Sequence, residues 1–306
     1  MEKTQKPDKK GGFVMHEINR EDVLRRLPRR AADTNKGSYG RVVAVAGSLA
    51  YRGAAALCCE SALRTGAGLV YLASVEPVIQ LVLSRTPECC ALPCRTDGDG
   101  GVMAADAAQV RQRFAHSRAV LLAGPGLGDS TGRVLNALCG IGAPWQGAVL
   151  DADALNAMAA GELGDTPFLP KDTVLTPHPG EMARLLGTTV EAVQADRPKA
   201  ALRCARRFGC VAVLKGTGTL VAAPDGQLVK NTTGNPGLAR GGSGDVLAGM
   251  LAALLAQGLP AFEAALCAVW LHGAAADACA ARTSQMTMLP HDILWDLGRI
   301  LGSAGL

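Results

Sequence analysis

Short apolar runs alternate with longer segments of helical apolar spacing along most of the chain. Each run is apolar at successive positions, which indicates a strand buried on both faces. The predicted strands cover residues 41–46, 68–73, 119–123, 148–151, 173–176 and 211–214. The predicted helices cover residues 54–65, 75–83, 104–115, 152–160, a segment that ends at 186, residues 190–208 with Pro198 as a kink or boundary, and three more that close the chain. This alternation is typical of an α/β fold in which helices cover both faces of a mostly parallel sheet.

One boundary is visible in the pattern, close to the start of the chain. Residues 1–12 are charged and lack apolar spacing, so we expect a disordered tail there. Residues 219–223 and 227–230 flank a Pro-Asp-Gly turn and predict a hairpin. No linker and no repeat follows the tail, so residues 13–306 are expected to form a single three-layer α/β/α domain.

Composition narrows the classes of protein. The chain has 306 residues, of which 48% are hydrophobic and 19% charged, enough for a substantial core. The net charge of +4 is modest and no basic stripe carries aromatic residues, so no nucleic-acid partner is expected. Apolar stretches are interrupted by Gly or polar residues before they reach membrane-spanning length, so no membrane association is expected. The ten cysteines show no C-x-x-C spacing and no signal peptide is evident, which favours reduced thiols in the cytoplasm.

The most informative segment is the glycine-rich turn GNPGLARGGSGD at residues 234–245, which runs directly into an apolar helix. The first amides of a helix have no internal acceptor and carry partial positive charge, so they can bind an anion. Gly242, Ser243 and Gly244 are therefore expected to form an anion hole, with Asp245 beside it as a general base. That combination suits transfer of a phosphoryl group to a hydroxyl. The alternative is that Asp245 only caps the helix; a P-loop is excluded because no Lys-Ser/Thr pair follows the last glycine.

Other distinctive segments follow the predicted strands, where ligands of such sheets gather. They are Gly47–Ser48, the loop 124–128, Asp151–Asp153, the TPHPGE segment at 176–181 and Lys215–Gly216. Each has an ordinary alternative. The loop 124–128 admits a ligand to the backbone or is only a tight turn; Lys215 meets phosphate or solvent.

The acidic and histidine candidates are also ambiguous. Asp151 and Asp153 fit a hydrated Mg²⁺, or Asp153 caps a helix. His178 and Glu181 are presented rigidly by two prolines, yet each could serve only at a helix start. The loop 36–41 could contact phosphate as a flap or be a plain surface loop. His272 is expected to be a packed helical histidine outside the site.

Taken together, these segments resemble the NAD(P)H-hydrate dehydratase family, a branch of the ribokinase-like superfamily. The resemblance runs from about Leu27 to the C-terminus, and its motifs are KGSYG at 36–40, GPGL at 124–127, LDAD at 150–153, LTPHPGE at 175–181, VLKG at 213–216 and GNPG…GGSGDVLAG at 234–249. It implies a ribokinase-like fold and a repair activity. The hydrated cofactors (S)-NADHX and (S)-NADPHX would be returned to NADH and NADPH. ADP, giving AMP and phosphate, or ATP would be the co-substrate, with Mg²⁺ as cofactor.

The resemblance also implies roles for particular residues. Asp245 would be the catalytic base, and Ala54, Gly126 and His178 would join it in contacting the hydrate. The adenine nucleotide would be lined by Lys215, Gly216, Thr217, Gly218, Thr219 and Gly244. Glu181 would support Mg²⁺ through water, although His178 stands where related vitamin kinases have Asn. Ser243 stands where many members have Thr, with little expected consequence.

The resemblance further implies partners. Only some 30 residues precede the match, so the NAD(P)H-hydrate epimerase of the same pathway is expected to be a separate chain, and a homotetramer is expected. The alternative function is a kinase for a thiazole or pyrimidine alcohol in the same superfamily, which the TPHPGE segment argues against. A nicotinamide-dependent oxidoreductase would need a G-x-G-x-x-G turn after the first strand, and residues 47–53 lack one. A nucleotide sensor would give no reason for Asp245 beside the glycine turn.

Overall fold

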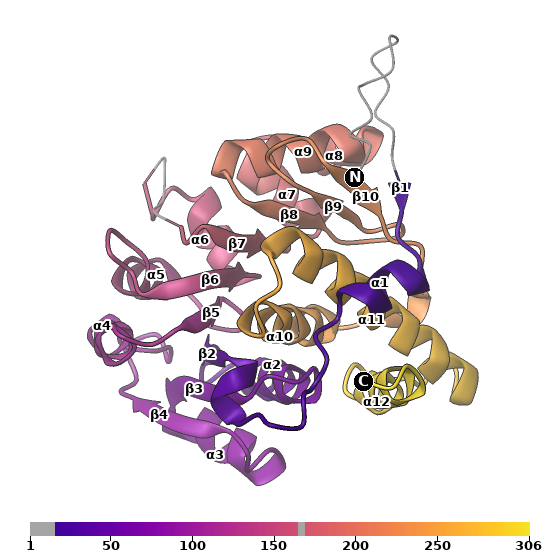
Figure 1. The fold of residues 1–306 in the computed structure, drawn as a ribbon. Helices are drawn as coiled ribbons and strands as arrows, with labels where there is room; N and C mark the ends of the chain where they lie inside the picture. Colours follow the sequence, from indigo (N-terminus) through magenta and orange to yellow (C-terminus); the bar gives the residue numbers. More distant parts are fainter. Residues whose placement is uncertain (1–15, 165–168) are drawn as a thin grey trace.

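The computed structural model describes residues 16–164 and 169–306, arranged as a central sheet between two layers of helices (Figure 1). The predicted tail at residues 1–12 lies outside the described residues. The sheet has ten strands in the order β1-β10-β9-β8-β7-β6-β5-β2-β3-β4. The strands are β1 His16–Glu17, β2 Arg41–Val45, β3 Leu69–Val75, β4 Cys90–Cys94, β5 Ala119–Ala123, β6 Trp145–Leu150, β7 Asp172–Leu175, β8 Val211–Leu214, β9 Leu220–Ala222 and β10 Leu228–Lys230. Only β9 runs against its neighbours, β8 and β10, so the sheet is mostly parallel as predicted.

Alternate strand residues divide between two apolar cores, one on each face of the sheet. In β2, Val42 and Ala44 face one core while Val43 and Val45 face the other, which explains the runs that are apolar throughout. The first core is covered by α1 Arg20–Arg26, α2 Arg52–Arg64, α3 Glu76–Arg85, α10 Ser243–Ala256, α11 Ala261–Arg282 and α12 Ile293–Ser303. The second is covered by α4 Ala104–Arg113, α5 Thr131–Leu138, α6 Asp153–Ala159, α7 Pro179–Leu186, α8 Val190–Ala195 and α9 Arg197–Phe208.

Two differences from the prediction have clear causes. The helix predicted over 190–208 is two helices, because Asp196 ends α8 and caps α9 by accepting the N–H of Lys199 at 3.0 Å. Pro198 therefore marks a boundary, and it sits in the first turn of α9, where proline is tolerated. Strand β4 was not predicted. It is an edge strand that contains Pro93 and is partly exposed, so it lacks the continuous apolar signature.

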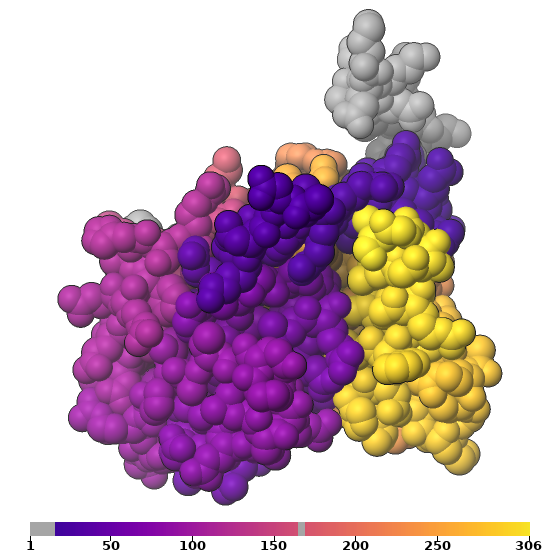
Figure 2. All heavy atoms as spheres, turned by 60° about the horizontal axis from the view of Figure 1, so that its bottom comes forward, coloured from indigo at the N-terminus to yellow at the C-terminus, as the bar shows by residue number. Residues whose placement is uncertain are grey.

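Helix α11 is long and apolar enough to cross a membrane, yet 72% of its most apolar window is buried within the protein. It packs against α10 and α12, as a core helix does. The space-filling view in Figure 2 shows the N-terminal part of the chain in indigo beside the yellow C-terminal helix. The Arg20 guanidinium accordingly donates to Ser303 Oγ at 3.4 Å, so the two ends of the described fold lie together.

Candidate active site

The order of the strands reverses between β2 and β5, which is where such sheets open a crevice at their carboxyl edge. The Gly47 N–H, after β2, donates to Pro125 O at 2.8 Å, after β5. Gly126 has φ +64°, and a Cβ there would lie 2.7 Å from Tyr51 Cβ and 3.1 Å from Ala54 Cβ. The structure therefore brings Ala54 and Gly126 together, and it adds the exposed Tyr51, whose side chain no sequence motif singled out.

A buried ion pair lies a few strands further along the same edge. Lys215 Nζ, after β8, donates to Asp151 Oδ1 at 2.7 Å, after β6, and lies 3.8 Å from Glu181 Oε2. Burial alone would lower the pKa of Lys215, but the carboxylates of Asp151 and Glu181 outweigh it and raise that pKa. Lys215 is therefore a fixed cation of the site and no solvated surface lysine.

Helix α10 begins beside this ion pair. A Cβ on Gly244 would lie 3.3 Å from Lys215 Nζ and 3.4 Å from Asp151 Oδ2. The N-cap residue is Gly242, at φ +97° and with no side-chain cap, so Asp245 is the third residue of the helix and the capping alternative is wrong. The Ser243 N–H donates to Arg240 O at 3.3 Å, whereas the amides of Gly244 and Asp245 have no partner among the described residues. The Gly242 N–H likewise has no partner among the described residues, so of the three predicted anion-hole residues Gly242 and Gly244 have available amides and Ser243 does not.

The Asp245 carboxyl group is suited to accept a proton near neutral pH. Burial, followed by the like charge of Asp151, raises the pKa of Asp245 to about 6, while Lys215 acts against the shift. A carboxylate with that pKa is mostly ionised at pH 7 and is a stronger base than an exposed aspartate.

His178 and Glu181 form a reciprocal cap at the start of α7. His178 Nδ1 accepts the N–H groups of Gly180 at 3.0 Å and Glu181 at 3.4 Å, and Glu181 Oε2 accepts the His178 N–H at 2.7 Å. Burial lowers the pKa of His178, so its imidazole is neutral and Nδ1 is free to accept. Burial raises the pKa of Glu181 to about 7. Both residues hold the structure of the site, and the half-exposed His178 ring also borders it.

The acidic residues do not form a direct metal cage. Asp153 Oδ2 accepts the Gly128 N–H at 2.9 Å, and Ala152, not Asp153, is the N-cap of α6. Asp151 is paired with Lys215. Across the described ranges, no group of three or more His, Cys, Asp or Glu side chains is placed to hold a metal ion. This donor set suits Mg²⁺ that keeps its waters and binds mainly to nucleotide phosphates.

The loop after β8 leads away from Lys215 and is partly open to solvent. Gly216 and Thr217 are exposed, and Thr219 Oγ1 donates to Gly216 O at 2.9 Å. Arg197, at the start of α9, donates to Leu214 O at 3.2 Å and Lys215 O at 3.3 Å. Arg197 thereby fixes the loop that carries Lys215, and its position in a polar helix gave no sequence signal.

The flap interpretation of residues 36–41 is wrong. Residues 36–40 precede β2, which begins at Arg41, so the segment lies at the opposite, amino edge of the sheet. A Cβ on Gly40 would come within 1.9 Å of Ala256 O, at the far end of α10 from Asp245. The surface-loop alternative is not accurate either, because Lys36–Tyr39 form a short 3-10 helix in which Tyr39 is buried.

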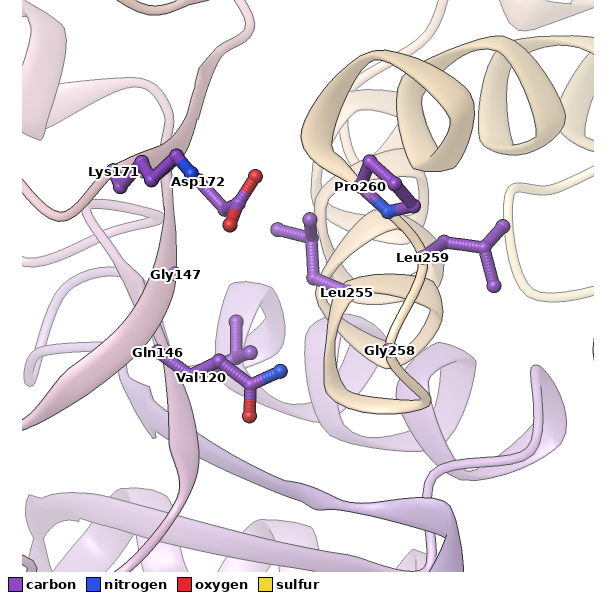
Figure 3. Close-up of a pocket in the computed structure, with 9 residues that line it drawn as sticks. All are labelled: Val120, Gln146, Gly147, Lys171, Asp172, Leu255, Gly258, Leu259 and Pro260. Carbon is purple, nitrogen blue, oxygen red and sulfur yellow. The ribbon is translucent and has the colours of Figure 1, made fainter.

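A cavity of about 230 Å³ also lies at the amino edge (Figure 3). It is lined by Val120, Gln146, Gly147, Lys171, Asp172, Leu255, Gly258, Leu259 and Pro260. Asp172 Oδ1 accepts the Ala261 N–H at 3.3 Å, at the start of α11. The candidate residues of the carboxyl edge do not line this cavity, so it is separate from the site.

The fold and the carboxyl-edge site define a protein of the ribokinase-like superfamily. A ribokinase-like superfamily protein of Enterococcus faecalis superimposes with a TM-score of 0.82 at 28% identity, covering 96% of this chain and 98% of that one. Within the superfamily, the chain belongs to the NAD(P)H-hydrate dehydratase family, whose model matches residues 42–298. This family membership and fold confirm the resemblance.

Individual relatives agree with the family assignment. The ADP-dependent (S)-NAD(P)H-hydrate dehydratase of Neisseria meningitidis is 42% identical over 253 residues, 81% of this chain and 80% of that protein. The bifunctional NAD(P)H-hydrate repair enzyme of Moorella thermoacetica is 44% identical over 275 residues, which are 88% of this chain but 50% of that protein. The chain thus spans about half the length of such bifunctional relatives. The ADP/ATP-dependent NAD(P)H-hydrate dehydratase of Bacillus subtilis, co-crystallised with ATP/Mg²⁺, gives a TM-score of 0.80 at 31% identity, covering 96% and 100% of the two chains.

Proposed function

We propose that this protein dehydrates (S)-NADHX and (S)-NADPHX to NADH and NADPH at the expense of ADP or ATP. The observation that carries the proposal is the start of α10, where a carboxylate with a pKa of about 6 stands beside the Gly244 and Asp245 peptide N–H groups, which make no hydrogen bond within the described parts of the chain. A phosphoryl group and a hydroxyl can meet there, and membership of the dehydratase family supplies the substrate class.

The chemistry converts a poor leaving group into a good one. The hydroxyl oxygen of the hydrate attacks the terminal phosphorus of the nucleotide as Asp245 takes the hydroxyl proton. The phosphorus–oxygen bond to the nucleotide breaks, and ADP leaves AMP. The amides of Gly244 and Asp245, together with Lys215, stabilise the negative charge on the transferred group.

Elimination completes the reaction. The lone pair of the ring nitrogen expels phosphate by breaking the carbon–oxygen bond, and the neighbouring ring carbon loses a proton. The dihydronicotinamide is thereby restored and no external oxidant or reductant is consumed.

We assign the nucleotide to Lys215, Gly216, Thr217, Gly218, Thr219 and Gly244, and the hydrate to Ala54, Gly126, His178 and Asp245. The contacts between Gly126 and Ala54 and between Gly244 and Lys215 support two neighbouring subsites on one edge of the sheet. Mg²⁺, which accompanies ATP in the Bacillus subtilis crystals, would bind phosphate oxygens here, with Glu181 reached through water. There it would neutralise phosphate charge.

The proposal also covers the partner enzyme, the oligomeric state and the cellular compartment. A separate NAD(P)H-hydrate epimerase is proposed to act in the same pathway, and the name of the bifunctional repair enzymes among the relatives is consistent with a second repair activity beside the dehydration. A homotetramer in the cytoplasm remains part of the proposal, and its mass in solution can be measured by light scattering. The ten cysteines are unpaired thiols, as a reducing compartment would keep them.

A direct assay tests the activity. The protein is incubated with Mg²⁺ and hydrated NADH, plus ADP or ATP, while the absorbance of reduced nicotinamide is followed. We expect signal growth that requires nucleotide and is matched by phosphate release. A stable phosphorylated alcohol from a thiazole or pyrimidine substrate, without repair of the hydrate, would instead support the kinase alternative.

A further inference from the structure

One face of helix α2 reaches both of the proposed subsites. Ala54, Leu57, Cys58 and Ser61 are spaced i, i+3, i+4 and i+7, so they lie on the same side of the helix. At the start of this face, Ala54 Cβ lies 3.1 Å from where a Cβ on Gly126 would be, in the part of the site assigned to the hydrate. The other three residues of the face lie against helix α10, which runs beside α2 (Figure 1).

Leu57 lies beside the N-cap of α10. A Cβ on Gly242 would lie 2.6 Å from Leu57 Cδ1 and 3.3 Å from Pro290 Cγ, so two apolar side chains fill the space that a side chain on the cap residue would need. Gly242 makes no side-chain cap hydrogen bond and adopts φ +97°. The first turn of α10 is therefore held by packing from outside the helix, whereas a polar cap residue commonly does this.

The next residue of the same face bonds to the backbone of the general base. Cys58 Sγ donates to Asp245 O at 3.3 Å, and Cys58 is fully buried. One turn further along α10, a Cβ on Gly249 would overlap with Cys58 O and Ser61 Oγ, so the two helix backbones are in close contact there. Because the backbones are this close, the position of Asp245 relative to α2 is fixed.

We propose that Leu57 and Cys58 are positioning residues, through which α2 sets the distance between the hydroxyl of the hydrate and the phosphoryl-binding amides at the start of α10. The proposal rests on the proposed function for its catalytic consequence. Neither residue is assigned to touch the reacting atoms. Since α2 contacts the hydrate subsite at Ala54 and α10 at Leu57, one helical turn joins the two reactants. A displacement of about 1 Å between reactants can cost about 10²-fold in rate.

The main test compares Leu57→Ala with Leu63→Ala on the same helix. Both residues are half-buried leucines that pack against the same core, so both variants lose the same side chain from similar surroundings. We expect Leu57→Ala to lose about tenfold or more in kcat with a smaller change in the KM for ADP, whereas Leu63→Ala keeps near-normal kinetics. Leu57→Met, which conserves the volume of the side chain, should recover most of kcat.

Two outcomes of this comparison would overturn the proposal. One is a kcat of Leu57→Ala within about twofold of that of Leu63→Ala. The other is a rise in the KM for ADP or for the hydrate without a fall in kcat, which would make Leu57 a binding residue.

The cysteine provides the same kind of test if Leu57→Ala does not fold. Cys58 and Cys59 are adjacent and both fully buried, so Cys58→Ala and Cys59→Ala remove the same atoms from one helix. Cys58→Ala should lower kcat by about threefold, and Cys58→Ser, which keeps a donor for Asp245 O, should restore it. Equal rates in Cys58→Ala and Cys59→Ala would also overturn the proposal.

A binding measurement separates this proposal from the proposed function. Inorganic phosphate is titrated into the protein in the presence of AMP, and its affinity is measured by calorimetry without turnover. Leu57→Ala should bind phosphate about tenfold or more weakly than Leu63→Ala, because displaced amides stabilise an anion poorly. Equal phosphate affinities would overturn the positioning role even in an active enzyme. A protein that shows this difference but no dehydration would refute only the proposed function.

Discussion

Helices α7 and α10 begin at the same edge of the sheet with the same local pattern and reach opposite results. Both carry glycine at the second helical position and a carboxylate at the third, Gly180 and Glu181 in α7 and Gly244 and Asp245 in α10. In α7, His178 takes up the first amides and Glu181 turns back to the cap. In α10, the cap is a glycine without a side chain, so the amides stay available and the carboxylate does not cap. The residue before the helix decides whether its start is structural or can bind a ligand.

The largest expected effect comes from removing the α10 carboxylate. Asp245→Asn should lower kcat by about 10²–10⁴-fold, because a general base is lost while the shape of the site is kept. ADP binding, measured by calorimetry, should change little. The matched comparison is Glu181→Gln at the same position of α7, which should lose less activity than Asp245→Asn, because Glu181 caps α7 and is proposed to meet Mg²⁺ only through water. Near-normal turnover of Asp245→Asn would contradict the claim that the α10 carboxylate acts as a general base while the α7 carboxylate serves as a cap.

The second effect comes from replacing the glycine in the first turn of α10 or of α7 by alanine, which tests whether that position must lack a side chain. Gly244→Ala places a methyl group 3.3 Å from Lys215 Nζ and should lower kcat/KM for ADP by about tenfold or more, by narrowing the anion hole. Gly180→Ala places it 2.8 Å from His178 Cε1, so it should disturb the cap and lower Tm instead. Equal kinetic losses in the two variants would mean that α10 holds no special anion site.

The third effect is a pH dependence. Since Asp245 has a pKa of about 6 and acts unprotonated, kcat/KM should fall by about tenfold for each pH unit below 6 and level off above it. Initial rates between pH 5 and 8 provide the check, with stability monitored in parallel. The fall of kcat/KM below pH 6 should persist in Glu181→Gln. This variant lacks the Glu181 carboxyl group, whose pKa is about 7 in the parent protein. If the fall below pH 6 disappeared in Glu181→Gln, the pH dependence would be due to Glu181 in α7 and not to Asp245.

The smallest effect concerns the cap itself. His178→Ala leaves the Gly180 and Glu181 amides without their acceptor and should lower the free energy of unfolding by about 1 kcal/mol. Urea denaturation measures the change. If His178 also contacts the hydrate, the KM for the hydrate should rise while the KM for ADP stays constant. Unchanged stability would show that the cap is not needed to hold α7.

Much of the fold follows from the sequence, because strands buried on both faces are continuously apolar and two of the predicted strands, 119–123 and 211–214, match β5 and β8 residue for residue. The convergence of segments at the carboxyl edge also follows from topology. The same reasoning, applied to residues 36–40, would have placed them at the amino edge, since they precede a parallel strand.

Pairings between distant residues could not be predicted. Asp151 and Lys215 are 64 residues apart and form an ion pair only once β6 and β8 occupy one sheet. The contrast between Glu181 and Asp245 depends on hydrogen bonds made by the cap residue, which the shared glycine and carboxylate pattern alone does not show. His272, by contrast, is buried within the apolar helix α11, as the sequence predicts.

The most direct test follows the oxygen that leaves the hydrate. The hydroxyl of hydrated NADH is labelled with a heavy oxygen isotope, the protein is given ADP and Mg²⁺, and the released phosphate is analysed by mass spectrometry. Phosphoryl transfer at the start of α10 predicts that the label appears in phosphate, because the carbon–oxygen bond breaks after the phosphorus–oxygen bond has formed. Label recovered in water, with unlabelled phosphate, would contradict the account.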